Sequence, residues 1–165
     1  MKSEVVEAIR MLAKEKDISE ESLFTAIEEA IKAGLEVLGF SDHSPYIFTD
    51  GHYSGFRMRP EELDGYVSTL SALREEYKDQ IKIYIGLEAE YYPADWRNYV
   101  SFITGKGLDY LILGQHYALG EFPGAAYSGK PDADEVRLRS YVDSVITGAR
   151  SGLFSYIAHP DMVRF

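Results

Sequence analysis

Apolar and polar positions follow two different periods along this chain, and each change of period marks a predicted element. Four short apolar runs end abruptly in acidic or imidazole side chains. Runs of this length, rich in β-branched and aromatic residues, are typical of buried strands. They occupy residues 35–43, 82–92, 109–116 and 153–161.

Between these runs the apolar residues recur every three or four positions, which predicts amphipathic helices. The helix that begins at Pro60 is the clearest, because proline suits the first helical position and two glutamates follow it. Ser19 and Gly34 fit the N-cap and C′ positions of an earlier helix. The expected helices cover residues 3–16, 19–33, 60–77, 95–104 and 132–151.

This order of elements predicts the fold class and the domains. Strands that alternate with helices form a parallel sheet with right-handed crossovers, so an α/β fold is expected. Residues of types that bind metals lie at successive strand ends, which favours a barrel, although four strands are too few to close one. We expect an N-terminal helical pair over residues 1–33 and an α/β domain over 34–165. Two long loops, 44–59 and 118–131, are typical of functional or disordered segments.

Composition removes several classes of function. The net charge of −10 argues against a nucleic-acid surface, which needs a basic stripe. With no cysteine, a metal would have to be held by His, Asp or Glu. No apolar run reaches the ~18 residues of a membrane span, and the N-terminus lacks a signal-peptide pattern. A cytoplasmic protein is the default expectation.

Three of the four histidines close a strand-like run. A single histidine at a strand end is more often structural, but His43, His116 and His159 in equivalent positions, together with Glu88, favour a shared site. Imidazole and carboxylate ligands suit zinc, manganese or iron. Glu88 is the natural ligand to share between two metals, which would clamp a phosphoryl group and provide a hydroxide nucleophile.

Five further side chains have both a functional and a structural interpretation. Arg57 and Arg59 could contact a phosphate, or Arg59 could simply border the helix at Pro60. His52 could contact substrate, stand in as a metal ligand or be an exposed loop residue. Glu90 could orient a ligand imidazole or be solvated, and Asp42 could hold its neighbour or cap the loop.

Four motifs carry a resemblance to a known family. The segments SDHSPY, GLEAEYYP, DYLILGQHY and AHPDMVRF closely resemble the polymerase and histidinol phosphatase (PHP) superfamily, in its histidinol-phosphatase branch, over residues 26–165. The resemblance implies a partial (β/α) barrel with metal ligands at the strand ends. His43 would bind one metal, Glu88 would bridge two others, and His116 and His159 would complete the second of those.

The resemblance also implies a reaction: hydrolysis of L-histidinol phosphate, a small phosphate ester, to L-histidinol and phosphate in histidine biosynthesis. Two family features have no counterpart here, an early His-x-His pair and a late Asp-x-His pair. A truncated barrel is therefore expected. The alternative is an inactive fragment that acts as a metal-binding or protein-interaction module, and a homo-oligomer could cover its exposed core.

The first thirty residues are similar to the opening helices of the bacterial transcription factor NusA, in a short match made of common helix formers. One interpretation is an amphipathic pair that covers exposed core. The other is a fusion, a misassembled gene or an engineered junction near residues 25–30.

Overall fold

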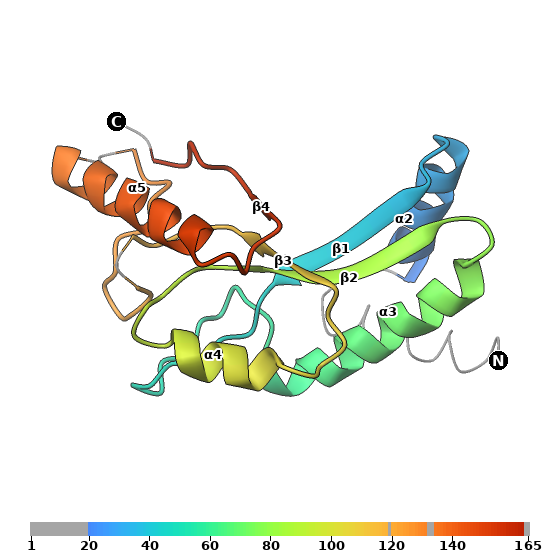
Figure 1. Cartoon of the computed structure of the whole chain (residues 1–165), viewed down its shortest axis with the longest axis horizontal. Helices are drawn as coiled ribbons and strands as arrows, with labels where there is room; N and C mark the ends of the chain where they lie inside the picture. The colour runs from blue at the N-terminus through green and yellow to red at the C-terminus, as the bar shows by residue number, and fades with distance from the viewer. Residues whose placement is uncertain (1–19, 119, 132–133, 164–165) are drawn as a thin grey trace.

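A computed structural model describes residues 20–118, 120–131 and 134–163 (Figure 1). Four strands form one parallel sheet in the order β1-β2-β3-β4, which confirms the predicted α/β class. The strands are β1 (Val37–His43), β2 (Lys82–Ala89), β3 (Tyr110–Leu113) and β4 (Tyr156–Ile157). The helices are α2 (Glu20–Lys32), the 3₁₀ turn η1 (Pro60–Glu62), α3 (Leu63–Tyr77), α4 (Trp96–Ile103) and α5 (Glu135–Arg150).

The main differences from the predicted elements lie near the C-terminal end. The apolar run at 153–161 forms only a two-residue strand. Helix α5 begins at Glu135, where the Asp134 side chain accepts a hydrogen bond from the backbone N–H of Arg137 at 2.8 Å. The expected start at Asp132, the expected helix 3–16 and the segment that resembles NusA up to residue 19 lie outside the described residues.

One face of the sheet carries the core. Ile83, Ile85 and Leu87 alternate along β2 and are at most 2% exposed, because α3 packs against this strand (Figure 1). Side chains alternate along a strand, so Glu88 lies on the opposite face. His43 is its partner in the parallel register and shares that face. The alternation that builds the core thus directs two candidate ligands away from it.

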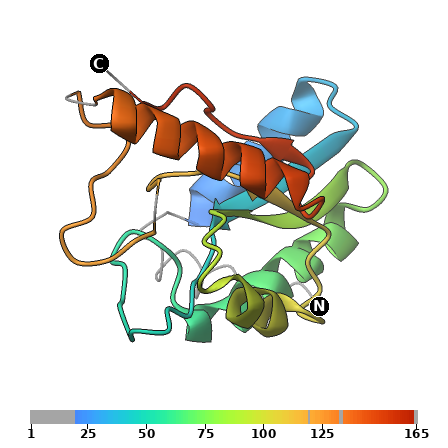
Figure 2. The ribbon, with the colours of Figure 1, turned by 60° about the vertical axis from the view of Figure 1, so that its left-hand side comes forward.

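The loop at residues 44–59 is packed into the protein. Tyr46 and Phe48 are buried, and the ring of Tyr46 stacks on Tyr99 with centroids 4.6 Å apart. Figure 2 shows this loop and residues 120–131 at the same end of the molecule. Both loops therefore approach the carboxyl ends of the strands. Among the described helices, none has the length and apolarity needed to cross a bilayer.

Candidate metal centre

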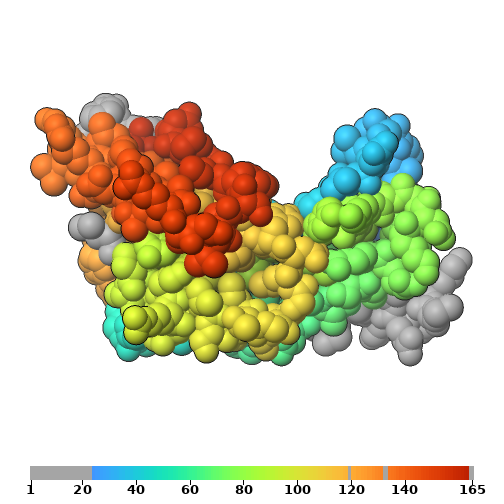
Figure 3. Space-filling view, viewed as in Figure 1, coloured from blue at the N-terminus to red at the C-terminus, as the bar shows by residue number. Residues whose placement is uncertain are grey.

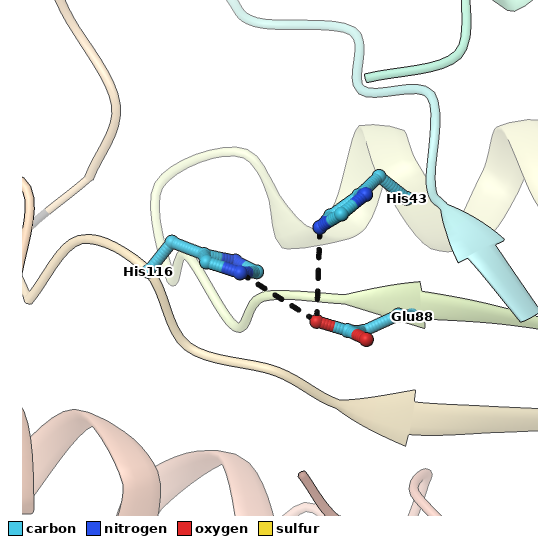
Figure 4. A group of neighbouring side chains, drawn as sticks. All are labelled: His43, Glu88 and His116. Carbon is cyan, nitrogen blue, oxygen red and sulfur yellow. Dashed lines mark ion pairs between the residues drawn. The ribbon is translucent and has the colours of Figure 1, made fainter. Parts of the chain in front are cut away.

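The four candidate ligands converge at the carboxyl edge of the sheet. His43 ends β1, Glu88 lies at the end of β2, and His116 and His159 follow β3 and β4. The Nε2 atoms of His159, His116 and His43 lie 3.0, 3.6 and 3.9 Å from Oε1 of Glu88. Figure 4 shows His43 and His116 pointing at this carboxylate from the segments on either side of β2. One oxygen atom is therefore the common neighbour of three imidazole rings.

These positions fit a divalent transition metal ion. Donor atoms of His43, Glu88 and His116 all lie within 4.8 Å of one another. Tetrahedral ligands about 2.0–2.1 Å from zinc are about 3.3 Å from each other, close to the separations found here. Imidazole nitrogen and carboxylate oxygen are donors that zinc, manganese and iron accept. The chemistry and the spacing of the donor set both suit such an ion.

Glu90 fixes the orientation of His116. Its Oε1 lies 2.9 Å from Nδ1 of the imidazole, and its side chain is 1% exposed. Burial alone would raise the pKa of Glu90, but the charge of Arg57 and hydrogen bonds from His116 and Arg57 lower it to about 2. The carboxylate is therefore charged at neutral pH, and Nδ1 of His116 carries the proton. This tautomer leaves the Nε2 lone pair facing Glu88.

Gly114 makes room for the Glu88 carboxylate. A Cβ built at this position would overlap the carboxylate of Glu88, so only glycine leaves the side chain in place. The sequence contained this signal, because a glycine interrupts the apolar run just before His116. The prediction from sequence did not include Gly114 in the site.

Gln115 is a second residue that the prediction missed. It is 1% exposed, accepts a hydrogen bond from the backbone N–H of Tyr91 at 3.0 Å, and donates one to the carbonyl of Tyr117 at 2.7 Å. These bonds hold the backbone on either side of His116. A buried amide beside a candidate ligand gave no recognisable sequence signal.

A family model for the PHP domain matches residues 17–165. This chain belongs to the PHP family. Over 140 residues it is 31% identical to a Deinococcus radiodurans protein assigned as a histidinol-phosphatase, covering 82% of this PHP chain and 52% of that protein. The PHP chain thus spans about half the length of this relative.

Two solved structures resemble the PHP chain. A Listeria monocytogenes protein assigned as a histidinol phosphatase superposes with a TM-score of 0.65 at 16% identity, over 82% of this chain and 59% of that one, and supports the fold alone. The histidinol phosphate phosphatase of Lactococcus lactis, in complex with zinc, L-histidinol and phosphate, gives a TM-score of 0.58 at 25% identity, over 82% and 50%.

His159 has the least regular backbone of the four candidate ligands of the PHP chain. Its φ of 32° is unusual for a residue with a side chain, and such strain is typical of functional positions. The hydroxyl of Tyr141 donates to its carbonyl at 3.2 Å. Its Nδ1 is buried and has no hydrogen-bond partner among the described residues. The ring is therefore aimed by its backbone and by Glu88.

Arg57 does not fit its predicted contact with phosphate in this PHP chain. The guanidinium is buried and donates to Glu90 at 2.8 Å through both terminal nitrogens, to Glu121 at 2.5 and 3.1 Å, and to the Ser44 carbonyl at 3.2 Å. Each of its N–H donors is thereby used, and none remains for a phosphate. No local sequence pattern indicates that two glutamates lie against this arginine.

Three other predicted residues have different surroundings. His52 is outside the cluster, with Nε2 3.4 Å from Oε1 of Glu121 and its ring against Phe48. Arg59 is exposed, and its guanidinium lies 5.2 Å from the ring centroid of Tyr53. Oδ1 of Asp42 accepts a hydrogen bond from the backbone N–H of His43 at 2.7 Å. The Asp42 contact fits the suggestion that this residue holds its neighbour.

Proposed function

We propose that His43, Glu88, His116 and His159 bind divalent metal and that this chain hydrolyses a small phosphate monoester. The observation that carries the proposal is the approach of three Nε2 atoms to Oε1 of Glu88, at 3.0–3.9 Å. L-Histidinol phosphate is the substrate to test first. The Lactococcus lactis neighbour, solved with zinc, L-histidinol and phosphate, supports this choice.

Zinc, manganese and iron all suit the donor set, and we propose zinc as the first ion to test. When bound, such an ion supplies Lewis-acid chemistry that polarises a phosphoryl oxygen and makes water nucleophilic near neutral pH. The chain's own residues hold and orient the ligands. Glu88 offers two carboxylate oxygens, which allows it to serve one ion or two. Glu90 keeps the proton of His116 on Nδ1.

Aromatic side chains line the proposed site and could contact the organic part of a substrate. The ring of Phe56 is 44% exposed and lies 5.4 and 5.8 Å from the rings of His43 and His116. The Tyr127 ring stacks on His116 at 6.2 Å. We propose that these rings contact the substrate imidazole and that the exposed Arg59 contacts its phosphate.

The wider assignments remain proposals that follow from this function. We propose a cytoplasmic role in histidine biosynthesis, with no nucleic-acid partner because of the net charge of −10. We also propose the boundary between residues 33 and 34 as the end of the N-terminal helical segment.

The test measures zinc and manganese binding by the purified chain, together with phosphate release from L-histidinol phosphate. The expected result is metal binding and turnover, both lowered more than about 100-fold by Glu88→Gln, since even residues that only orient ligands typically contribute 10- to 100-fold. Metal binding without phosphate release would favour a metal-binding module. A protein that neither binds metal nor releases phosphate would overturn the proposal.

A further inference from the structure

Arg57 joins three segments that are far apart in sequence. It comes from the 44–59 loop, Glu90 follows β2, and Glu121 belongs to the second long loop. The three side chains are 2%, 1% and 5% exposed, so this is a dry ion-pair network. One guanidinium lies between two carboxylates, and the planar fork matches both of them.

Two of these contacts lead directly to candidate ligands. The two carboxylate oxygens of Glu90 each accept a hydrogen bond from one terminal nitrogen of Arg57 at 2.8 Å. One of them, Oε1, also lies 2.9 Å from Nδ1 of His116. Arg57 also donates to the carbonyl of Ser44, the residue after His43. The guanidinium therefore contacts a neighbour of each of two ligands on different strands.

The contact with Glu121 connects the second loop to the same point. Residues 120–131 also meet the His116 segment where the backbone N–H of Ser128 donates to the His116 carbonyl at 2.9 Å. The ring of Tyr127, from this loop, stacks on His116. Arg57 and His116 thus hold the loop at two separate places.

We propose that Arg57 is a positioning residue of the metal centre, which fixes Glu90 so that His116 keeps its proton on Nδ1 and holds residues 120–131 against the ligands. The inference rests on the proposed metal site. A purely structural ion pair would stabilise the fold without affecting the tautomer of His116 or the affinity for metal. These two quantities therefore distinguish the two roles.

The first experiment uses the full chain with Arg57→Lys, which keeps the charge but loses the planar fork. In the metal-free protein, ¹⁵N chemical shifts of the imidazoles should show a single Nδ1–H tautomer for His116 in the wild type and a mixture in the variant. Zinc affinity, from chelator competition, should fall about 10- to 100-fold. Wild-type shifts and affinity in Arg57→Lys would overturn the proposal.

Arg74→Lys is the control, because it makes the same substitution in an arginine–carboxylate pair, with Asp109, at the amino end of β3. It should leave the His116 tautomer and zinc affinity unchanged even if the melting temperature falls. An equal loss of affinity in this variant would assign the effect to stability and count against Arg57. The tautomer is measured without metal, so it tests Arg57 even if the wild type binds no zinc.

Glu121→Gln keeps the Arg57–Glu90 pair and tests the contact with the loop at residues 120–131. It is also the variant to use if Arg57→Lys does not fold. Chymotrypsin should cleave after Tyr127 several-fold faster than in the wild type, while Nδ1–H of His116 is retained. Zinc affinity should fall less than in Arg57→Lys. Unchanged cleavage would remove the loop from the proposal, and wild-type affinity together with unchanged cleavage would overturn it.

Discussion

The two sides of the sheet, β1–β2 and β3–β4, differ in the length of their strand pairing and in burial, and the longer-paired, more buried side is the better supported. Strands β1 and β2 share seven register pairs, and the core of β2 is almost fully buried. Strands β3 and β4 share two pairs, and Tyr156 and Ile157 of β4 are 56% and 39% exposed. In Figure 3 the surface is hollowed between α2 and the unit formed by α5 and β4. Apolar residues are thus buried in β2 but largely exposed in β4.

This difference divides the ligands. His43 and Glu88 lie at the ends of β1 and β2, and His116 follows β3, which shares four register pairs with β2. His159 instead follows β4, which shares only two pairs with β3, and has a φ of 32°. All three imidazoles approach Glu88, but only His159 follows a strand of two residues. We therefore expect the proposed metal site to respond unequally to changes on its two sides.

The largest effect on stability is expected at alkaline pH, which should destabilise the well-supported side of the sheet. Burial raises the pKa of Tyr46, Tyr66, Tyr92 and Tyr99, so the folded state keeps these hydroxyls neutral. In the unfolded chain they ionise near pH 10. Their stabilising contribution is complete below that pH and is lost as the pH rises above it, by about 1.4 kcal/mol per tyrosine per pH unit.

The measurement is the tyrosinate absorbance near 295 nm during a pH titration, with circular dichroism alongside. These tyrosines should ionise only together with the loss of secondary structure. If all the tyrosines ionised smoothly near pH 10 in a protein that stayed folded, the burial of this aromatic group would be wrong.

Ile85→Ala should give the next largest effect. The side chain is fully buried in the centre of β2, beneath α3, where solvent does not reach it. Truncation of a buried isoleucine costs about 2–5 kcal/mol, through lost burial and the cavity that remains. Urea unfolding followed by circular dichroism measures this. A loss below 1 kcal/mol would mean that the β1–β2 side is much less closely packed than described.

The comparison also separates what the sequence could predict from what it could not. The apolar run in 82–92 correctly predicted a buried strand, in which Ile83 and Ile85 are 2% and 0% exposed, because an apolar run is a local signal of burial. The role of Arg57 was missed, since its partners Glu90 and Glu121 lie 33 and 64 residues away. Nothing in the local pattern indicates such distant pairs.

The C-terminal part was predicted less well for a related reason. The apolar run at 153–161 has the same local pattern as β2, yet the structure pairs only two of its residues with β3. Strand length depends on a neighbour that offers hydrogen bonds, and on a layer that covers the side chains. Neither requirement can be read from the run itself.

Gly114→Ala should reduce zinc affinity about 10- to 100-fold, the range expected when a ligand's support is lost. The new methyl group would displace the carboxylate of Glu88, as the overlap of a Cβ with that group indicates. Isothermal titration with zinc measures the change. Gly65→Ala is the control, because its Cβ meets nothing within 4 Å and it lies in α3.

That control should bind zinc normally and stabilise the helix by about 0.5–1 kcal/mol, since alanine restricts the unfolded chain more than glycine does. A Gly114→Ala protein with wild-type zinc affinity would contradict the position of Glu88. Equal losses in both variants would indicate that glycine replacement disturbs the fold in general.

His159→Asn should have a smaller effect on the same site, about 10-fold in zinc affinity or less. Asparagine tolerates positive φ, so the substitution removes the imidazole while keeping the backbone that β4 presents. His116→Asn, on the better supported side, should lose clearly more. A loss for His159→Asn that equals or exceeds the loss for His116→Asn would reverse the proposed ranking of the two sides.

The smallest effect is expected on α5, where the apolar side chains face outward. Val136, Val142 and Ile146 are 71%, 42% and 40% exposed, while Tyr141 and Gly148 form the buried side of the helix. Isoleucine and serine have similar helix propensities, and Ile146 is already partly in water, so Ile146→Ser should change the free energy of unfolding by about 0.5 kcal/mol or less. Urea unfolding at two protein concentrations measures this. A loss above 1 kcal/mol that grows with concentration would mean that a second copy covers this side of α5.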